Sequence, residues 1–74
     1  MQSETLYLRL PRAHVAMFRF LLEAHDGLAL FTSLGADAAN REILCLRFVP
    51  GAKPLVRRFL DAARTEMPLE LLPC

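Results

Sequence analysis

The chain has little charge imbalance and no long apolar run, and each absence excludes a class of protein. Its 74 residues carry a formal net charge of +1. A protein that holds nucleic acid mainly through phosphate contacts needs a clear excess of positive charge, so this balance argues against that class. The longest apolar runs are only a few residues, far short of the roughly 20 residues that cross a membrane as a helix. The sequence therefore predicts no membrane-spanning segment.

Cysteines and targeting features are equally scarce. The two cysteines, Cys45 and Cys74, are too few for a disulfide framework and predict free thiols in a reducing compartment. The opening residues Met1-Gln2-Ser3-Glu4 lack the basic segment and apolar core of a secretory signal. We therefore expect a cytoplasmic protein.

Apolar residues are abundant, at 54% of the chain. This fraction excludes an intrinsically disordered chain, which has few apolar residues and a large net charge. A chain of this length closes only one small core, so we expect a single domain over residues 1–74. Because the apolar fraction is high for so short a chain, part of its surface is predicted to be buried in an oligomer.

Two periodicities divide the chain into strands and helices. Apolar residues at alternate positions and short apolar runs predict four strands, at residues 5–10, 28–33, 42–49 and 69–72. Helical spacing predicts a helix of about four turns over 12–26, ended by Gly27, and a second from Pro54 to Pro68. The second helix has an apolar stripe that begins at Leu55. Six inward-facing residues are predicted to form the core: Leu8, Phe18, Leu22, Leu44, Leu46 and Phe59.

The order of these elements is β-α-β-β-α-β. With right-handed crossovers it predicts an α+β, ferredoxin-like fold, in which one four-stranded antiparallel sheet has both helices on one face. The expected strand order is 4-1-3-2, with the first and third strands in the centre.

The sheet face away from the helices is the strongest functional feature of the predicted fold. Five largely apolar residues are expected there as an interface: Tyr7, Phe31, Ile43, Cys45 and Val49. An open sheet face normally carries polar residues, and a contiguous apolar patch marks an association surface. We therefore expect this face to meet a second copy or another protein, unless the patch proves discontinuous.

Two arginines lie among these apolar residues. Arg9 and Arg47 are candidates for binding an anion or another small ligand, and a homodimer would bring two copies of each together. Because an unpaired buried arginine is costly, each is expected to rim the interface or to pair with Glu42 or Glu70.

No residue cluster with recognisable chemistry is present in the sequence. His14 and His25 lie eleven positions apart on one predicted helix, about 16 Å along its axis, so they cannot share a metal ion within one chain. The serines, threonines and cysteines lack the partners of a nucleophilic site, and the carboxylates form no evident pair. We therefore predict a non-catalytic protein without metal or cofactor, although an accessory subunit of an enzyme stays possible.

Two resemblances bear on function. The stretch from His14 through Gly27-Leu28-Ala29-Leu30, in which a helix leads through glycine into a strand, resembles ACT-type regulatory domains. Other stretches are similar to a small bacterial family described only as a domain of unknown function: Tyr7-Leu8-Arg9, Phe20-Leu21-Leu22-Glu23-Ala24, Asp26-Gly27-Leu28-Ala29 and Arg57-Arg58-Phe59-Leu60. The ACT resemblance implies a ferredoxin-like fold, self-association and sensing of a small ligand.

The alternative is an RNA- or protein-binding adaptor that uses the open sheet face and the helix carrying Arg57 and Arg58. RNA-recognition modules share this topology and stack bases on aromatic residues of the central strands. The predicted third strand offers aliphatic residues at those positions, and Tyr7 is the one plausible stacking ring. Nucleic acid is therefore the less favoured partner.

Overall fold

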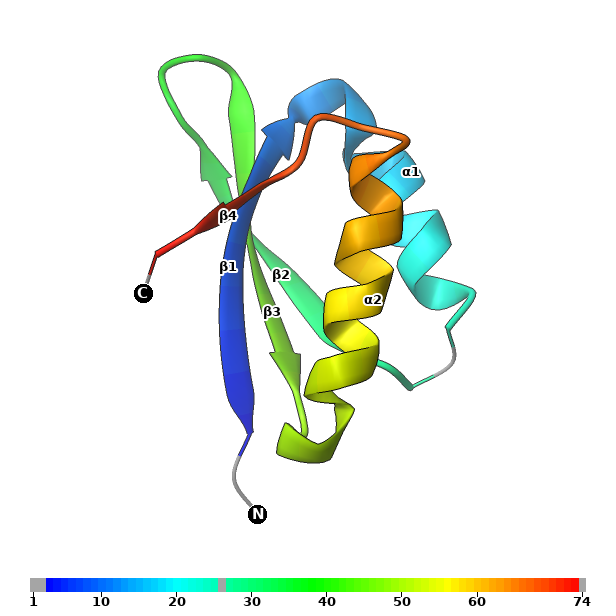
Figure 1. Cartoon of the computed structure of the whole chain (residues 1–74). Coiled ribbons are helices and arrows are strands. Elements are labelled where there is room, and N and C mark those ends of the chain that lie inside the picture. Colours follow the sequence, from blue (N-terminus) through cyan, green and yellow to red (C-terminus); the bar gives the residue numbers. More distant parts are fainter. Residues whose placement is uncertain (1–2, 26, 74) are drawn as a thin grey trace.

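The computed structural model describes residues 3–25 and 27–73. Its elements follow the predicted order of strands and helices (Figure 1): β1 (Glu4–Pro11), a 3-10 turn η1 (Arg12–His14), α1 (Val15–Glu23), β2 (Leu30–Ala36), β3 (Arg41–Phe48), a 3-10 turn η2 (Pro50–Ala52), α2 (Lys53–Arg64) and β4 (Glu70–Leu72). The strands form one antiparallel sheet in the order β2-β3-β1-β4. This is the predicted order read from the other edge, so the α+β fold class is confirmed.

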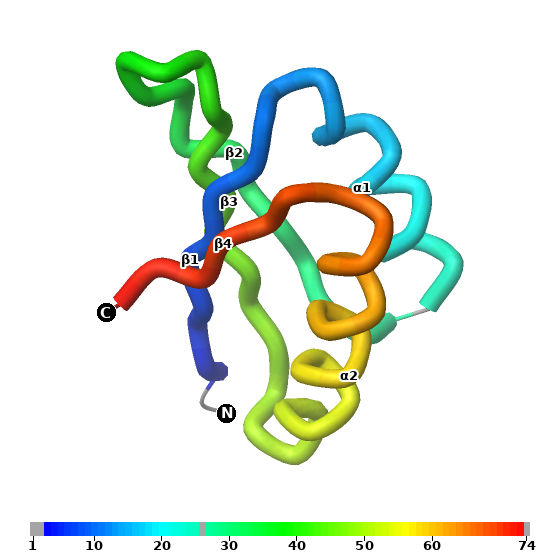
Figure 2. Tube along the Cα trace, turned by 45° about the horizontal axis from the view of Figure 1, so that its top comes forward, coloured from blue at the N-terminus to red at the C-terminus, as the bar shows by residue number. Residues whose placement is uncertain are grey.

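The two helices lie on the same side of the sheet, and the views in Figures 1 and 2 agree on this arrangement. The central strands β1 and β3 alternate strictly, so every second side chain points toward the helices. Leu8 pairs with Leu44 across these strands, and both are fully buried. The core therefore occupies the space between one sheet face and the two helices.

Phe18 of α1 lies at the centre of this core and is completely buried. Its ring centroid is 5.9 Å from that of Phe31 in β2 and 5.6 Å from that of Phe59 in α2, both in edge-to-face arrangements. Such aromatic pairs add to the stabilisation from burial itself. All six residues predicted as core are buried: Leu8, Phe18, Leu22, Leu44, Leu46 and Phe59.

Both helices differ in detail from the prediction. The first is shorter, because its opening turn is 3-10 and its last turn tightens, with the amide of His25 donating to the carbonyl oxygen of Leu22 at 3.0 Å. In α2, Leu55 is 54% exposed and does not belong to the inward stripe. The stripe begins instead at Val56. Residues at positions i, i+3, i+4 and i+7 share one face of a helix, and the four buried residues of α2 have this spacing: Val56, Phe59, Leu60 and Ala63.

The second strand shows the largest departure. It begins two residues later than expected, and its faces are reversed. Phe31 pairs with the buried Leu46 and contacts Phe18, so it faces the helices. Leu30 pairs with Arg47 and is 76% exposed. The prediction that Phe31 lies on the outward face is therefore wrong, because the large ring fills the space beside Phe18 and the smaller leucine is left outside.

The outer sheet face as candidate functional site

The register places the outward side chains of the four strands in rows. We call the sheet surface away from α1 and α2 the outer face. Its middle row crosses all four strands, and the rows on either side follow from the same pairing. The middle row is Leu72, Tyr7, Cys45 and Thr32; one neighbouring row is Glu70, Arg9, Ile43 and Gly35, and the other is Thr5, Arg47 and Leu30.

The centre of the outer face is apolar and open to solvent. Tyr7 is 36% exposed, and its cross-strand neighbours Cys45 and Leu72 are half-buried, as is Ile43. No helix of the described chain lies on this side (Figure 2). The structure thus brings together three of the five residues expected at the interface.

The other two predicted interface residues lie elsewhere. Phe31 is on the opposite side of the sheet, where the guanidinium of Arg19 sits 5.3 Å from its ring centroid. Val49 follows the last residue of β3 and is 49% exposed, so it lies beyond the strand ladder. The sequence pattern also missed Leu30, because the apolar run from Leu28 to Phe31 contains no polar residue that distinguishes its two faces.

A cluster of four charged side chains lies at one end of the outer face. Arg9 of β1 contacts Glu70 of β4 at 2.6 Å and Asp37 of the β2–β3 turn at 3.6 Å. Arg41 of β3 contacts the same two carboxylates, at 3.2 Å from Asp37 and 3.7 Å from Glu70. The predicted pairing of Arg9 with Glu70 is confirmed. The sequence pattern does not predict the contacts of Asp37 and Arg41, because the folding of the β2–β3 hairpin brings these two residues to the cluster.

Backbone and side-chain donors keep both carboxylates of this cluster ionised. The amide of Arg41 donates to Asp37 at 3.0 Å and, with the amide of Ala39 at 2.9 Å, lowers the pKa of that carboxyl, assisted by the two arginines. The hydrogen bond from Arg9 is the main cause of a lowered pKa at Glu70. The local charge is therefore balanced, and Arg9 is not available as an unpaired anion-binding group.

Arg47 lies at the other end of the outer face. It is exposed, and within residues 3–25 and 27–73 it makes no ion pair. Of the two alternatives expected for Arg47, a place at the rim or an ion pair, pairing with Glu42 is not found, because Glu42 is cross-strand from Leu10 and so points to the helix side, where it accepts a hydrogen bond from the hydroxyl of Ser33. Of the two candidate ligand-binding arginines, only Arg47 has an unoccupied guanidinium.

The remaining candidate groups are distributed over the fold. His14 lies in the turn η1, and His25 packs edge-on against Phe59 with ring centroids 5.2 Å apart. Among the described residues no three potential ligands gather around a metal position, and no helix is long and apolar enough to cross a membrane. Cys45 is a free thiol, whereas Cys74 lies outside the described residues.

A family model described as a domain of unknown function (DUF4911) matches residues 8–67. The chain belongs to this family. The matched segment runs from β1 to the residue before Pro68 and contains Arg9, Ile43, Cys45 and Arg47, while β4 lies beyond it. No curated protein and no solved structure matched the chain. The predicted membership of a family of unknown function is thus confirmed.

Proposed function

We propose that this DUF4911 protein is a non-catalytic association module whose outer face meets the outer face of a second copy. The observation that carries the proposal is the largely apolar middle row, in which Tyr7 is exposed and its neighbours Cys45 and Leu72 are half-buried. A homodimer interface is self-complementary about a two-fold axis, so a row of apolar side chains on one sheet can pack against the same row of a second copy.

The energetics favour burial of this row. Association stabilises by about 25 cal/mol for each Å² of apolar surface removed from water, before the rigid-body cost is subtracted. Burial of an unpaired arginine would oppose association. Arg9 already contacts Glu70 and Asp37, so this end of the face enters an interface with its charges balanced.

The charged cluster also supports a non-catalytic role. A general acid needs a raised pKa so that it holds its proton near neutral pH. Asp37 and Glu70 have lowered pKa values because arginines and backbone amides stabilise their charged forms. Their arrangement fits a structural ion-pair cluster rather than a pair of carboxylates poised for proton transfer.

Sedimentation of the wild-type chain and of Ile43→Lys tests this proposal. Ile43 lies on the outer face and outside the buried core, so Lys at this position should separate the copies without unfolding them. The matched control is Leu55→Lys, which places the same charge at an exposed apolar position of α2. We expect the control to keep the wild-type mass. A wild-type protein that sediments as a monomer at high micromolar concentration contradicts the proposal.

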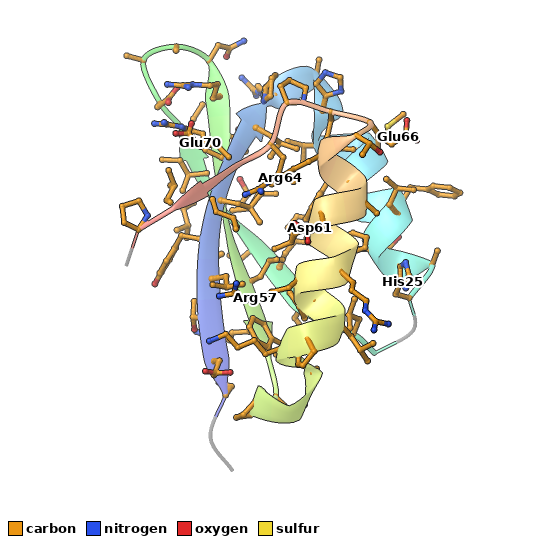
Figure 3. The ribbon with its side chains drawn as sticks, viewed as in Figure 1. His25, Arg57, Asp61, Arg64, Glu66 and Glu70 are labelled. Carbon is orange, nitrogen blue, oxygen red and sulfur yellow. The ribbon has the colours of Figure 1, made fainter. Side chains whose placement is uncertain are left out.

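A second candidate function uses the cations of α2. Arg57 and Arg58 are exposed and form no ion pair within the described residues, whereas Arg64 lies 3.9 Å from Asp61. Figure 3 shows Arg57 on α2, in the helical layer rather than on the outer face. The outer face and the exposed side of α2 belong to different layers of the molecule, so one partner would not easily contact both. The second candidate is therefore phosphate binding along α2 alone.

Salt dependence distinguishes the two candidates. Phosphate binding by Arg57 and Arg58 should weaken between roughly 50 and 200 mM salt. The slope of the logarithm of the binding constant against the logarithm of the salt concentration grows with the number of phosphate contacts. Apolar association at the outer face should change little over the same range. The second candidate is supported if Arg57→Gln reduces the affinity for RNA and the control variant Arg12→Gln does not. Undetectable RNA binding at low salt contradicts it.

A further inference from the structure

A pocket of about 310 Å³ opens where β3 ends and the segment after α1 enters β2. Its walls are largely apolar, and those that matter here are Leu28, Leu30, Phe48 and Val49. This volume is at the small end of the range for sites that hold organic molecules. The pocket therefore suits a small molecule with a hydrocarbon portion.

Among the described residues of the lining, Arg47 is the one that carries a charge. Its counterparts on the sheet, Arg9 and Arg41, each contact two carboxylates. Arg47 contacts none among the described residues. A guanidinium presents two parallel N–H groups that match one carboxylate, and such a charged pair is stronger than a neutral hydrogen bond. The pocket thus combines an apolar interior with a single binding point for an anion.

We propose that this pocket binds a small aliphatic monocarboxylate, with its head on Arg47 and its chain against Phe48 and Val49. A phosphate ester suits the pocket less well, because a doubly charged group requires several donors, and the described part of the lining offers one cation beside Ser3. The single positive charge of the lining matches the single negative charge of a carboxylate.

The location of the pocket links this ligand to the outer face, a consequence that rests on the proposed function. Leu30 and Arg47 are cross-strand neighbours on the outer face and also line the pocket. In a two-fold assembly each copy brings an unpaired Arg47 to the interface region, where positive charge is costly to desolvate. A bound carboxylate neutralises that charge, so it strengthens association, and association strengthens its binding by the same factor.

Binding is tested by NMR titration of the full chain with sodium octanoate, and with octan-1-ol as the uncharged probe of similar length. We expect octanoate to shift the amide signals of Leu28, Leu30 and Val49 and to bind more tightly than the alcohol. Arg47→Gln should weaken octanoate binding about tenfold and abolish the preference over octanol. Arg57→Gln, which removes an exposed arginine from α2, should leave the octanoate affinity and the preference over octanol unchanged. Equal weakening by the two variants, or signal shifts confined to other surfaces, overturns the proposal.

The Ile43→Lys variant separates this proposal from the outer-face association. The pocket lies within one copy, so folded Ile43→Lys should still bind octanoate, and loss of binding there overturns a single-chain site. In wild type, octanoate should raise the sedimenting mass at low protein concentration, and in Arg47→Gln it should not. If octanoate binds at Arg47 while wild type remains a monomer, the pocket is upheld and the association proposal fails.

Discussion

At the scale of single residues, stability depends on how side chains meet at the centre of the core. Phe18 of α1 contacts both Phe31 of β2 and Phe59 of α2. Two positions along the same helix, Phe20 is 71% exposed. The same residue type thus occupies two opposite environments within one turn of helix.

We expect Phe18→Ala to lower the free energy of unfolding by about 3–5 kcal/mol, because it removes the ring and leaves a cavity between three elements. That loss approaches the whole stability of a small domain. Urea unfolding followed by circular dichroism measures it, with Phe20→Ala as the control that removes the same atoms from the surface. Similar midpoints for the two variants would show that α1 does not pack through Phe18.

At the scale of elements, the β2–β3 hairpin is shaped by its turn. Asn40 has φ of 61°, in the left-handed region that Asn adopts more readily than most residues. Asp37 accepts hydrogen bonds from the amides of Ala39 and Arg41 and contacts Arg9 of the neighbouring strand. One carboxylate therefore both closes the turn and ties it to β1.

The turn carboxylate should make stability depend on pH. The pKa values of Asp37 and Glu70 in the folded chain lie below their ordinary values of 3.8 and 4.5. Groups of this kind stabilise the fold fully above the ordinary pKa, and the contribution is lost as the pH falls through the lowered one. We expect the stability of the wild type to decline below about pH 4.5. The Asp37→Asn variant should be less stable than the wild type at pH 7, and its stability should fall less as the pH is lowered. Thermal melts from pH 7 to 3 measure this.

Asp61→Asn is the matched control for the turn variant, because the ion pair of Asp61 within the described residues is a long one, 3.9 Å to Arg64 on the exposed side of α2. It should leave the acid profile close to that of wild type. A profile for Asp37→Asn that is indistinguishable from this control would mean that the turn carboxylate does not stabilise the fold.

At the scale of the whole molecule, the described chain has one apolar core between a sheet and two helices and one open sheet face. The two sheet edges also differ. The short strand β4 lies between Pro68 and Pro73, whereas β2 has seven residues without proline or charge. Charges and prolines on an edge strand discourage pairing with other chains. The β2 edge has a different feature, an irregular register between Ser33 and Gly35, and such bulges also hinder pairing with other chains.

The core should suffice for folding without metal or a disulfide. We expect neither EDTA nor a reducing agent to change the melting temperature, because the buried residues are hydrophobic and Cys45 is a free thiol. Calorimetry with each additive, together with elemental analysis, measures this. Stoichiometric metal in the purified protein, or loss of the transition on reduction, would contradict the expectation.

The sequence alone determined the fold class, the strand order and most of the core. In β1, Leu6, Leu8 and Leu10 alternate with Thr5, Tyr7 and Arg9, so a shift of one residue would bury polar groups and the pairing has one favourable register. The strong contrast between the two faces of α2 acts in the same way. Periodic contrast between polar and apolar residues is local information, and it predicted the buried face of these elements, although it placed the start of the α2 stripe at the exposed Leu55.

Only the tertiary structure decided the orientation of β2 and the partners of the charged residues. From Leu28 to Phe31 every residue is apolar, so local patterning assigns no face, and the contact of Phe31 with Phe18 chooses one. Arg9 meets Asp37 although 28 positions separate them. The same folding places Arg47 beside an apolar pocket and without an ion pair to any described residue. These features depend on which distant side chains compete for the same space and charge, and a one-dimensional pattern does not contain that competition.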